Sequence, residues 1–190
     1  MPKIIEDEAI FQAVIQTITE RGYSGATTKQ IAEAANVSEV TLFRKYENKL
    51  QLVKRAIAAM VEDTSFYEAT RYTGDIQADL LRVLQAYQSS VVLHDAFFVM
   101  LFSEISRDPE LARSFEEPLQ LFEAVGKLFQ RYQAEGQLRE EHPLNTVAEF
   151  LGPFIYSAML RSMMLEDVLP PLDEKKHIQF FLEGRSVRSR

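Results

Sequence analysis

The stretch of residues 27–46 constrains the fold of this chain most, because it contains two very short helical segments joined by a tight turn. Thr27 or Thr28 can cap the segment KQIAEAA, and Ser38 can cap the segment EVTLFRKY. Helices of about two turns are not stable by themselves. These two must therefore pack against the helices on either side, so residues 1 to about 55 are predicted to form one bundle.

The spacing of small and apolar residues in this stretch is typical of a helix-turn-helix. Ala32 is small enough for two helices to cross, and Asn36 can adopt the positive φ that the turn needs. Leu42 is predicted to anchor the second helix in a small core with Ile31 and Val37. The opposite face of that helix then presents Glu39, Val40, Thr41, Phe43, Arg44 and Lys45. Such a face can enter the major groove of DNA.

The rest of the chain repeats apolar residues at every third and fourth position, and no segment keeps the period of two that strands require. The fold class is therefore predicted to be all-α. The first helix is expected over Glu6–Arg21, with Gly22 after its end, and the fourth runs from a cap at Asn48 to about Glu62. Further helices are expected over Ile76–Leu93, Ala96–Ser106, Pro109–Phe115, Pro118–Glu135, Leu144–Val168 and Glu174–Glu183.

Charge is distributed unevenly along the chain, whose net charge is −7. Residues 27–55 hold six cations and three acids, a net charge of +3, whereas residues 56–190 hold thirteen cations and twenty-one acids, a net charge of −8. This asymmetry suggests a DNA-facing module joined to an acidic body. Apolar periodicity is also lost over residues 64–75. We therefore expect a helix-turn-helix DNA-binding domain over residues 1–55 and a larger helical domain over residues 56–190.

What the sequence lacks disfavours several other classes of protein. There is no cysteine, and His94, His142 and His177 have no metal-ligand partners at helical spacing. No nucleophile elbow, glycine-rich phosphate loop or His-paired nucleophile is visible, so we expect no catalytic residue, metal or cofactor. No apolar run approaches the ~20 residues of a membrane span, and the acidic start MPKIIEDEAIF does not fit a signal peptide. The sequence predicts a cytoplasmic protein that is not an enzyme.

The segment TTKQIAEAANVSEVTLFRKYENKLQL resembles the signature of the TetR family of transcriptional regulators. That signature contains a threonine-capped helix, an Ile-Ala pair, an Ala-Gly-Val-Ser turn, a Thr-Leu-Tyr segment and a Ser-Lys pair. The later segments AEGQLREEHPLNTVAEFLG and FFLEG are similar to the family's approach to its dimerisation helix and to its C-terminal ending. Asn36, Val40, Phe43 and Tyr46 depart from the family's usual Gly, small residue, Tyr and Phe. The Tyr46 ring is expected in the core.

The resemblance implies a homodimer that binds a near-palindromic operator in double-stranded DNA. Carried over to this sequence, it implies phosphate contacts from Thr28, Lys29, Ser38 and Lys49. It implies contacts with base edges from Glu39, Val40, Thr41, Phe43 and Arg44, with Lys45 on the same helix. Arg44 suits guanine, and Glu39 can accept from the amino group of cytosine.

The resemblance also implies that the second domain binds a small molecule, which changes the distance between the two recognition helices of the dimer. Because ligand pockets are mostly apolar, the residues predicted to line this one are Phe98, Phe102, Phe122, Phe129, Phe154 and Met159. The fourth helix is expected to transmit the change, since it runs from the DNA towards the second domain.

The dimer is expected to form through the helices Leu144–Val168 and Glu174–Glu183. These helices offer more apolar surface than one monomer can easily cover, from Phe154, Ile155, Met159, Met163, Phe180 and Phe181. Gly152, Ser157 and Ala158 would allow two helices to approach closely.

The sequence therefore predicts a ligand-responsive transcriptional regulator, most simply a repressor that a small apolar effector releases from its operator. Two alternatives stay open. One is an all-α interaction protein without sequence-specific DNA binding, and the other is a TetR-like regulator that uses a co-repressor or no small ligand.

Overall fold

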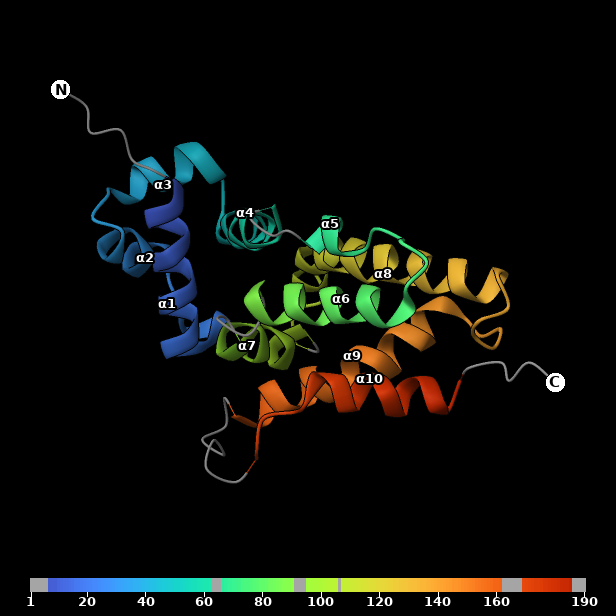
Figure 1. Cartoon of the computed structure of the whole chain (residues 1–190). Helices are drawn as coiled ribbons and strands as arrows, with labels where there is room; N and C mark the ends of the chain where they lie inside the picture. Colours follow the sequence, from blue (N-terminus) through green and yellow to red (C-terminus); the bar gives the residue numbers. More distant parts are fainter. Residues whose placement is uncertain (1–6, 63–65, 91–94, 106, 162–168, 186–190) are drawn as a thin grey trace. The chain divides into compact units, whose positions relative to one another are not determined.

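Helices make up the regular structure of the part of the chain that is described here (Figure 1). The structure is a computed structural model, and it describes residues 7–62, 66–90, 95–105, 107–161 and 169–185. The α-helices are α1 (Asp7–Gly25), α2 (Thr28–Ala34), α3 (Glu39–Tyr46), α4 (Lys49–Glu62), α5 (Phe66–Ala69), α6 (Ile76–Ser90), α7 (Asp95–Ile105), α8 (Glu116–Ala134), α9 (Pro143–Leu160) and α10 (Glu174–Glu183). A short 3-10 helix, η2 (Leu111–Phe115), precedes α8. The predicted all-α class is confirmed.

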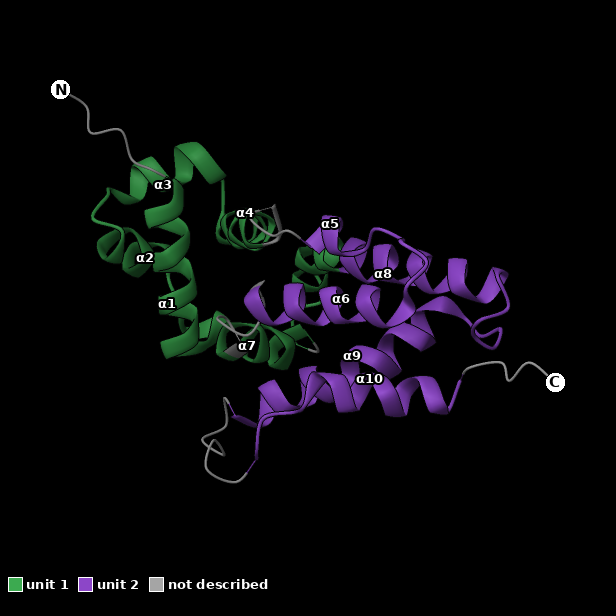
Figure 2. Cartoon of the chain, in the orientation of Figure 1, with its two compact units in different colours: residues 1–63, 94–118 green, residues 64–93, 119–190 purple. Residues whose placement is uncertain are grey.

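The backbone divides into two compact units (Figure 2). Unit 1 comprises residues 1–63 and 94–118, and unit 2 comprises residues 64–93 and 119–190. Unit 1 thus adds α7 and η2 to the first four helices. The domain boundary predicted between residues 55 and 56 stays a prediction, because these two units describe how the backbone packs and not which parts fold independently.

Unit 1 is built around α1, whose apolar residues follow the helical period. Ile10, Val14 and Ile18 are fully buried and share one core with Leu52 of α4 and Phe97 of α7. Burying a side chain of this size stabilises a fold by about 1.5–3 kcal/mol. The helix α1 packs against α2, α4 and α7, and η2 packs against α4 and α7. The two short helices α2 and α3 are therefore held by a larger bundle, as their length requires.

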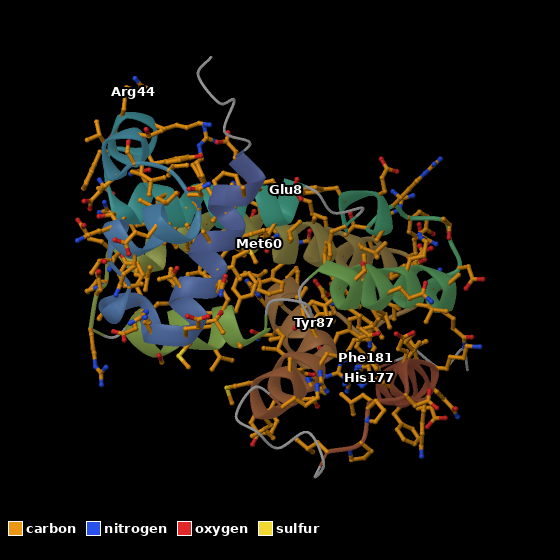
Figure 3. All side chains as sticks on the ribbon, turned by 90° about the vertical axis from the view of Figure 1, so that its left-hand side faces the viewer. Glu8, Arg44, Met60, Tyr87, His177 and Phe181 are labelled. Carbon is orange, nitrogen blue, oxygen red and sulfur yellow. The ribbon has the colours of Figure 1, made fainter. Side chains whose placement is uncertain are left out.

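Unit 2 has an aromatic core made by α8, α9 and α10. The ring centroid of Phe150 lies 5.6 Å from that of Phe129 and 4.9 Å from that of Phe181. His177 borders this cluster, next to Phe181 on α10 (Figure 3), and its Nε2 lies 2.8 Å from the carbonyl oxygen of Phe150. Because a carbonyl oxygen can only accept, Nε2 is the donor of this bond, and burial lowers the pKa of His177.

A buried carboxylate, Asp79, joins the start of α6 to the preceding loop and to α8. It accepts hydrogen bonds from the backbone amide of Thr73 at 2.8 Å, from the Tyr132 hydroxyl at 2.6 Å and from Arg82 at 2.8 Å. Burial alone would raise the pKa of Asp79, but these hydrogen bonds outweigh it and hold the pKa below its ordinary value. The buried carboxylate and these three donors thereby satisfy one another's hydrogen-bonding needs in unit 2.

Some predicted element boundaries differ from the observed ones. The first helix does not end before Gly22; it kinks there, at φ 71°, and continues to Gly25. The segment after Pro109 forms a five-residue 3-10 helix instead of an α-helix, and the aperiodic stretch 64–75 contains the one-turn helix α5. The predicted Glu6, residues 91–93, Ser106 and residues 162–168, with Met163, lie outside the described residues.

Two of the side chains predicted for a dimer interface are buried within unit 2. Phe154 packs edge-on against His177, with ring centroids 5.0 Å apart, and Phe181 packs against Phe150. Two other predicted side chains, Ile155 and Phe180, are exposed, and so are Leu144 and Tyr156 on the same helices. The prediction was wrong for Phe154 and Phe181, because both rings pack inside unit 2, and the dimer itself stays a prediction.

No helix within the described ranges combines the length and the apolar character needed to cross a bilayer.

Candidate nucleic-acid interface

The helix α2 begins at a complete capping box. The Thr27 hydroxyl accepts from the backbone amide of Gln30 at 3.2 Å, and the Gln30 side chain accepts from the backbone amide of Thr27 at 3.0 Å. Two amides that have no partner within the helix are thereby satisfied. The sequence prediction left Thr27 and Thr28 open as the cap, and the structure assigns the cap to Thr27.

The turn between α2 and α3 forms at the predicted residue. Asn36 has a φ of 54°, a conformation that Asn and Gly adopt more readily than other residues. The amide of Val37 then donates to the carbonyl of Ala32 at 2.9 Å. Ala32 and Leu42 are each 2% exposed and belong to the core of unit 1. The predicted crossing residue, turn residue and anchor are confirmed.

The helix α3 is fixed at its start and leaves one face free. The Ser38 side chain accepts from the backbone amide of Thr41 at 3.1 Å. Leu42 and Tyr46 are buried, whereas Val40 is 76% exposed and Phe43 is 47% exposed. Arg44 is also exposed and projects away from the ribbon (Figure 3). An eight-residue helix that keeps two bulky apolar residues and an arginine in solvent presents a surface suited to the major groove.

Two predicted DNA contacts pair with each other in the structure. The Thr28 hydroxyl, at the start of α2, donates to a carboxylate oxygen of Glu39, at the start of α3, at 2.5 Å. Both side chains are half-buried. This bond joins the start of α2 to the start of α3.

The end of α3 is tied to the start of α1 through Asp7. Lys45 and the Tyr46 hydroxyl both donate to the same oxygen of the Asp7 carboxylate. Burial would raise the pKa of Asp7, but these hydrogen bonds outweigh it and lower the pKa. Burial and the Asp7 hydrogen bond raise the pKa of Tyr46, so its hydroxyl stays protonated as the donor. Tyr46 lies in the core, as predicted.

Lys49, a predicted phosphate contact, makes its contacts within unit 1. Its ammonium donates to the carbonyl oxygens of Tyr23 at 2.7 Å and Ala26 at 3.1 Å, and it lies 4.1 Å from the centroid of the Tyr23 ring. Lys29, by contrast, is exposed on the first turn of α2. The two lysines that the sequence assigned to one role therefore have different surroundings.

The six residues predicted to line a ligand pocket are divided between the units. Phe98 and Phe102 belong to α7 in unit 1, where Phe102 stacks on Phe115 with ring centroids 4.5 Å apart. Phe122, Phe129, Phe154 and Met159 belong to unit 2. Phe129 and Phe154 are packed in its core, and Phe122 and Met159 are half-buried.

Two hollows open elsewhere on the molecule. One, of about 470 Å³, is bounded in unit 1 by Asp7, Phe11, Lys45, Tyr46, Glu47, Gln51, Arg55, Ala58 and Ala59. The other, of about 360 Å³, is bounded in unit 2 by Ile76, Gln77, Gln137, Gln179, Leu182 and Glu183. Neither hollow is lined by a residue predicted to bind the effector. In the described residues, no group of three or more His, Cys, Asp or Glu side chains is arranged to hold a metal ion.

Sequence reasoning missed residues that stabilise unit 1 through hydrogen bonds between distant parts of the chain. Asp7 lies 38 positions from Lys45, and Glu104 of α7 accepts from the hydroxyl of Ser24 at 2.8 Å, across 80 positions. Glu47, between α3 and α4, has a φ of 65°. No local pattern marks these residues, because each is determined by which helices meet in the fold.

Known proteins resemble the chain in both sequence and fold. The model of the family described as "Bacterial regulatory proteins, tetR family" matches residues 10–56, from α1 into α4. The HTH-type transcriptional regulator YvkB of Bacillus subtilis is 30% identical over 145 residues, which cover 75% of this chain and 68% of that protein. The HTH-type transcriptional repressor DhaR of Mycobacterium sp. is 28% identical over 174 residues, covering 84% and 82%. The fatty acid degradation regulator FadR from Bacillus halodurans has the same fold, with a TM-score of 0.73 at 16% identity, over 94% of this chain and 99% of that chain.

A capped helix-turn-helix with a free face on its second helix, together with these relatives, defines a helix-turn-helix transcriptional regulator. The chain belongs to the TetR family of bacterial regulatory proteins.

Proposed function

We propose that this regulator is a dimeric repressor that binds a near-palindromic operator through α3 and is released by a small apolar effector. The observation that carries the DNA-binding part is the free face of α3. Val40, Phe43 and Arg44 are exposed on a helix that the Ser38 cap fixes at its start and the Lys45–Asp7 pair fixes at its end. Leaving bulky apolar side chains in water has a cost, which contact with thymine methyl groups and base edges would offset.

The proposed contacts fall into two groups. Thr28, Lys29 and Ser38 lie at the N-termini of α2 and α3, where backbone amides and a lysine favour phosphate. The base-edge group is Glu39, Val40, Thr41, Phe43 and Arg44, with Lys45 at its edge. Because Lys45 is paired with Asp7, we assign it a smaller share of the binding energy than Arg44.

One recognition helix offers too few base contacts for useful specificity, so the operator should contain two half-sites related by a two-fold axis. The outward apolar residues of α9 and α10 support a dimer through these helices. Tyr156 and Phe180 are each 58% exposed, and Leu144 and Ile155 are also exposed. Gly152 has open space beside its α-carbon, which would let a partner helix approach.

The repressor sense is supported by the name of DhaR, a transcriptional repressor that is similar over most of the chain. The effector is proposed to be small and apolar because the interior of unit 2 is aromatic. We propose that α4 transmits its binding, since α4 packs against α3 within unit 1. A coupling of ~1–3 kcal/mol would be typical, and operator DNA would weaken effector binding by the same factor. A co-repressor would instead strengthen operator binding.

The test of DNA binding starts from a pool of random duplexes. Fragments retained by the full-length protein are sequenced, and the affinity for the selected duplex is measured in competition with a scrambled duplex of equal length. We expect a selected site with two-fold symmetry and a preference of at least about 10³ over the scrambled duplex. A protein that retains all duplexes equally would refute sequence-specific binding, and a site of unrelated half-sites bound by a monomer would refute the dimer.

The test of the dimer face uses charge on an outward apolar residue. Phe180→Glu should produce a monomer at micromolar concentration, measured by light scattering, whereas the matched control Lys175→Glu on the same helix should remain a dimer. If the Phe180→Glu variant is as dimeric as the wild type, the dimer does not use this face of α10.

A further inference from the structure

Two adjacent donors at the end of α3 share one acceptor. Lys45 and the Tyr46 hydroxyl both donate to the same oxygen of Asp7, the first residue of α1. The Lys45–Asp7 pair is exposed, with 41% and 47% of the side chains accessible, and an exposed ion pair alone contributes little. The Tyr46 bond is different, because Tyr46 is only 7% exposed. A buried hydroxyl that lacks a partner is costly, so Asp7 satisfies a donor that belongs to the core.

The Tyr46 hydroxyl is a feature of this chain. The TetR signature usually has Phe at this position, where the ring alone fills the core. Here Phe11 packs beside the ring, with ring centroids 6.0 Å apart, and the added hydroxyl finds Asp7. Asp7 lies before residues 10–56, which the family model matches. The bond therefore joins the helix-turn-helix to a residue outside the matched segment.

The helix that carries Asp7 is firmly held, whereas α3 is short. Ile10, Val14 and Ile18 of α1 are fully buried, and α1 packs against α2, α4 and α7. The eight residues of α3 are too few for a helix that is stable by itself, and helix ends fray. Asp7 therefore fastens the end of α3 to a helix that the core of unit 1 holds in place.

The charges around Asp7 keep it ionised as an acceptor. Burial would raise its pKa, but the hydrogen bonds from Lys45 and Tyr46, together with the charges of Lys45 and of Arg55 on α4, outweigh burial and lower the pKa. An ammonium has three donors, so Lys45 can keep this bond and still contact DNA. The contact is therefore compatible with a bound operator.

We propose that Asp7 is a positioning residue for DNA recognition, which fixes the last turn of α3 through Tyr46 and Lys45. The exposed face that it orients carries Phe43 and Arg44, so Asp7 determines how sharply these residues discriminate between bases. The cap at the start of α3 fixes the other end, and binding groups must be held to within about 0.5 Å to act. The proposal rests on the proposed DNA-binding function.

The test measures a specificity ratio, the affinity for the selected operator divided by the affinity for a scrambled duplex of equal length. Asp7→Ala is compared with Glu8→Ala, the neighbouring exposed acid on α1 (Figure 3). Both variants remove one negative charge and so raise the affinity for every duplex alike. Partial unfolding would lower both affinities by the same factor. The ratio therefore reports the placement of α3 itself.

We expect Asp7→Ala to lower the specificity ratio about tenfold, because the operator complex must then supply the free energy that the lost hydrogen bonds supplied. A scrambled duplex makes no base contacts that need an ordered α3, so its affinity is spared this cost. Glu8→Ala should keep the wild-type ratio. Equal ratios for Asp7→Ala and Glu8→Ala would overturn the proposal.

Tyr46→Phe covers the case in which Asp7→Ala does not fold, because it keeps the ring and removes only the hydroxyl. It should lower the ratio about threefold, and an unchanged ratio would overturn the proposal. In the double variant, the two losses should combine to less than their product, since both break the same bond. Losses that multiply in full would count against a shared contact.

The failure of this proposal can be told apart from the failure of the proposed function. If the wild type binds operator and scrambled duplex equally, the proposed function fails. The coupling between Asp7→Ala and Tyr46→Phe in the free energy of unfolding then still decides whether Asp7 holds the end of α3 in the free protein. If the wild type prefers the operator and the Asp7 variant keeps that preference, only the positioning role fails.

Discussion

The helix-turn-helix and the α8–α10 region use their bulky apolar residues in opposite ways. On α3, Val40 and Phe43 remain in solvent, while side chains at the helix start and end supply hydrogen bonds that hold it. In unit 2, Phe129, Phe150 and Phe181 are packed against one another. The difference teaches that an exposed aromatic residue signals binding when the element that carries it is stabilised by other means. A buried aromatic residue mainly supports the fold.

The largest expected effect is the loss of Phe129, which is fully buried in unit 2. Phe129→Ala should lower the free energy of unfolding by about 3–5 kcal/mol, because it leaves a cavity among aromatic rings. The matched variant from the other region is Phe43→Ala, which should change the free energy of unfolding by only about 0.5 kcal/mol but weaken operator binding. The free energies of unfolding of both variants are measured by denaturant unfolding at one protein concentration. Similar losses of stability in the two variants would erase the contrast between the regions.

Asp79 tests whether unit 2 also depends on a polar contact. Asp79→Asn should cost about 2–3 kcal/mol, since Arg82, Tyr132 and Thr73 lose a charged acceptor. The folded pKa of Asp79 lies below its ordinary value. Its contribution is therefore fully present above the ordinary pKa of an aspartate and is lost as the pH falls through the folded pKa. Stability measured against pH should fall more steeply in acid for the wild type than for Asp79→Asn, and parallel curves would count against this role.

The caps of the helix-turn-helix should have a smaller effect. Thr27→Ala removes one half of the capping box and should cost about 1 kcal/mol of stability. Gln12→Ala, at an exposed position of α1, serves as the control and should stay within about 0.5 kcal/mol of the wild type. If the two variants unfold at the same denaturant concentration, α2 does not depend on its cap.

The sequence predicted the local features of this protein well and the distant ones poorly. The Ser38 cap, the positive φ of Asn36 and the buried Ala32 and Leu42 each follow from a few neighbouring residues, and all were found. The pairing of Asp7 with Lys45 depends instead on how α1 meets α3. The spacing of apolar residues predicts a helix, but it does not tell which side of a long helix packs against which neighbour. For this reason Phe154 was expected at a dimer surface and lies inside unit 2.

The most direct test of the central claim, that the free face of α3 determines which DNA is bound, is a base-by-base specificity profile. The affinity of the wild type and of Arg44→Ala is measured for every single-base variant of the selected operator. We predict that Arg44→Ala loses about 1–3 kcal/mol of discrimination at one base pair in each half-site, with the other positions unchanged. A profile for Arg44→Ala that is identical to the wild-type profile, or that is weakened equally at every base pair, would contradict the account.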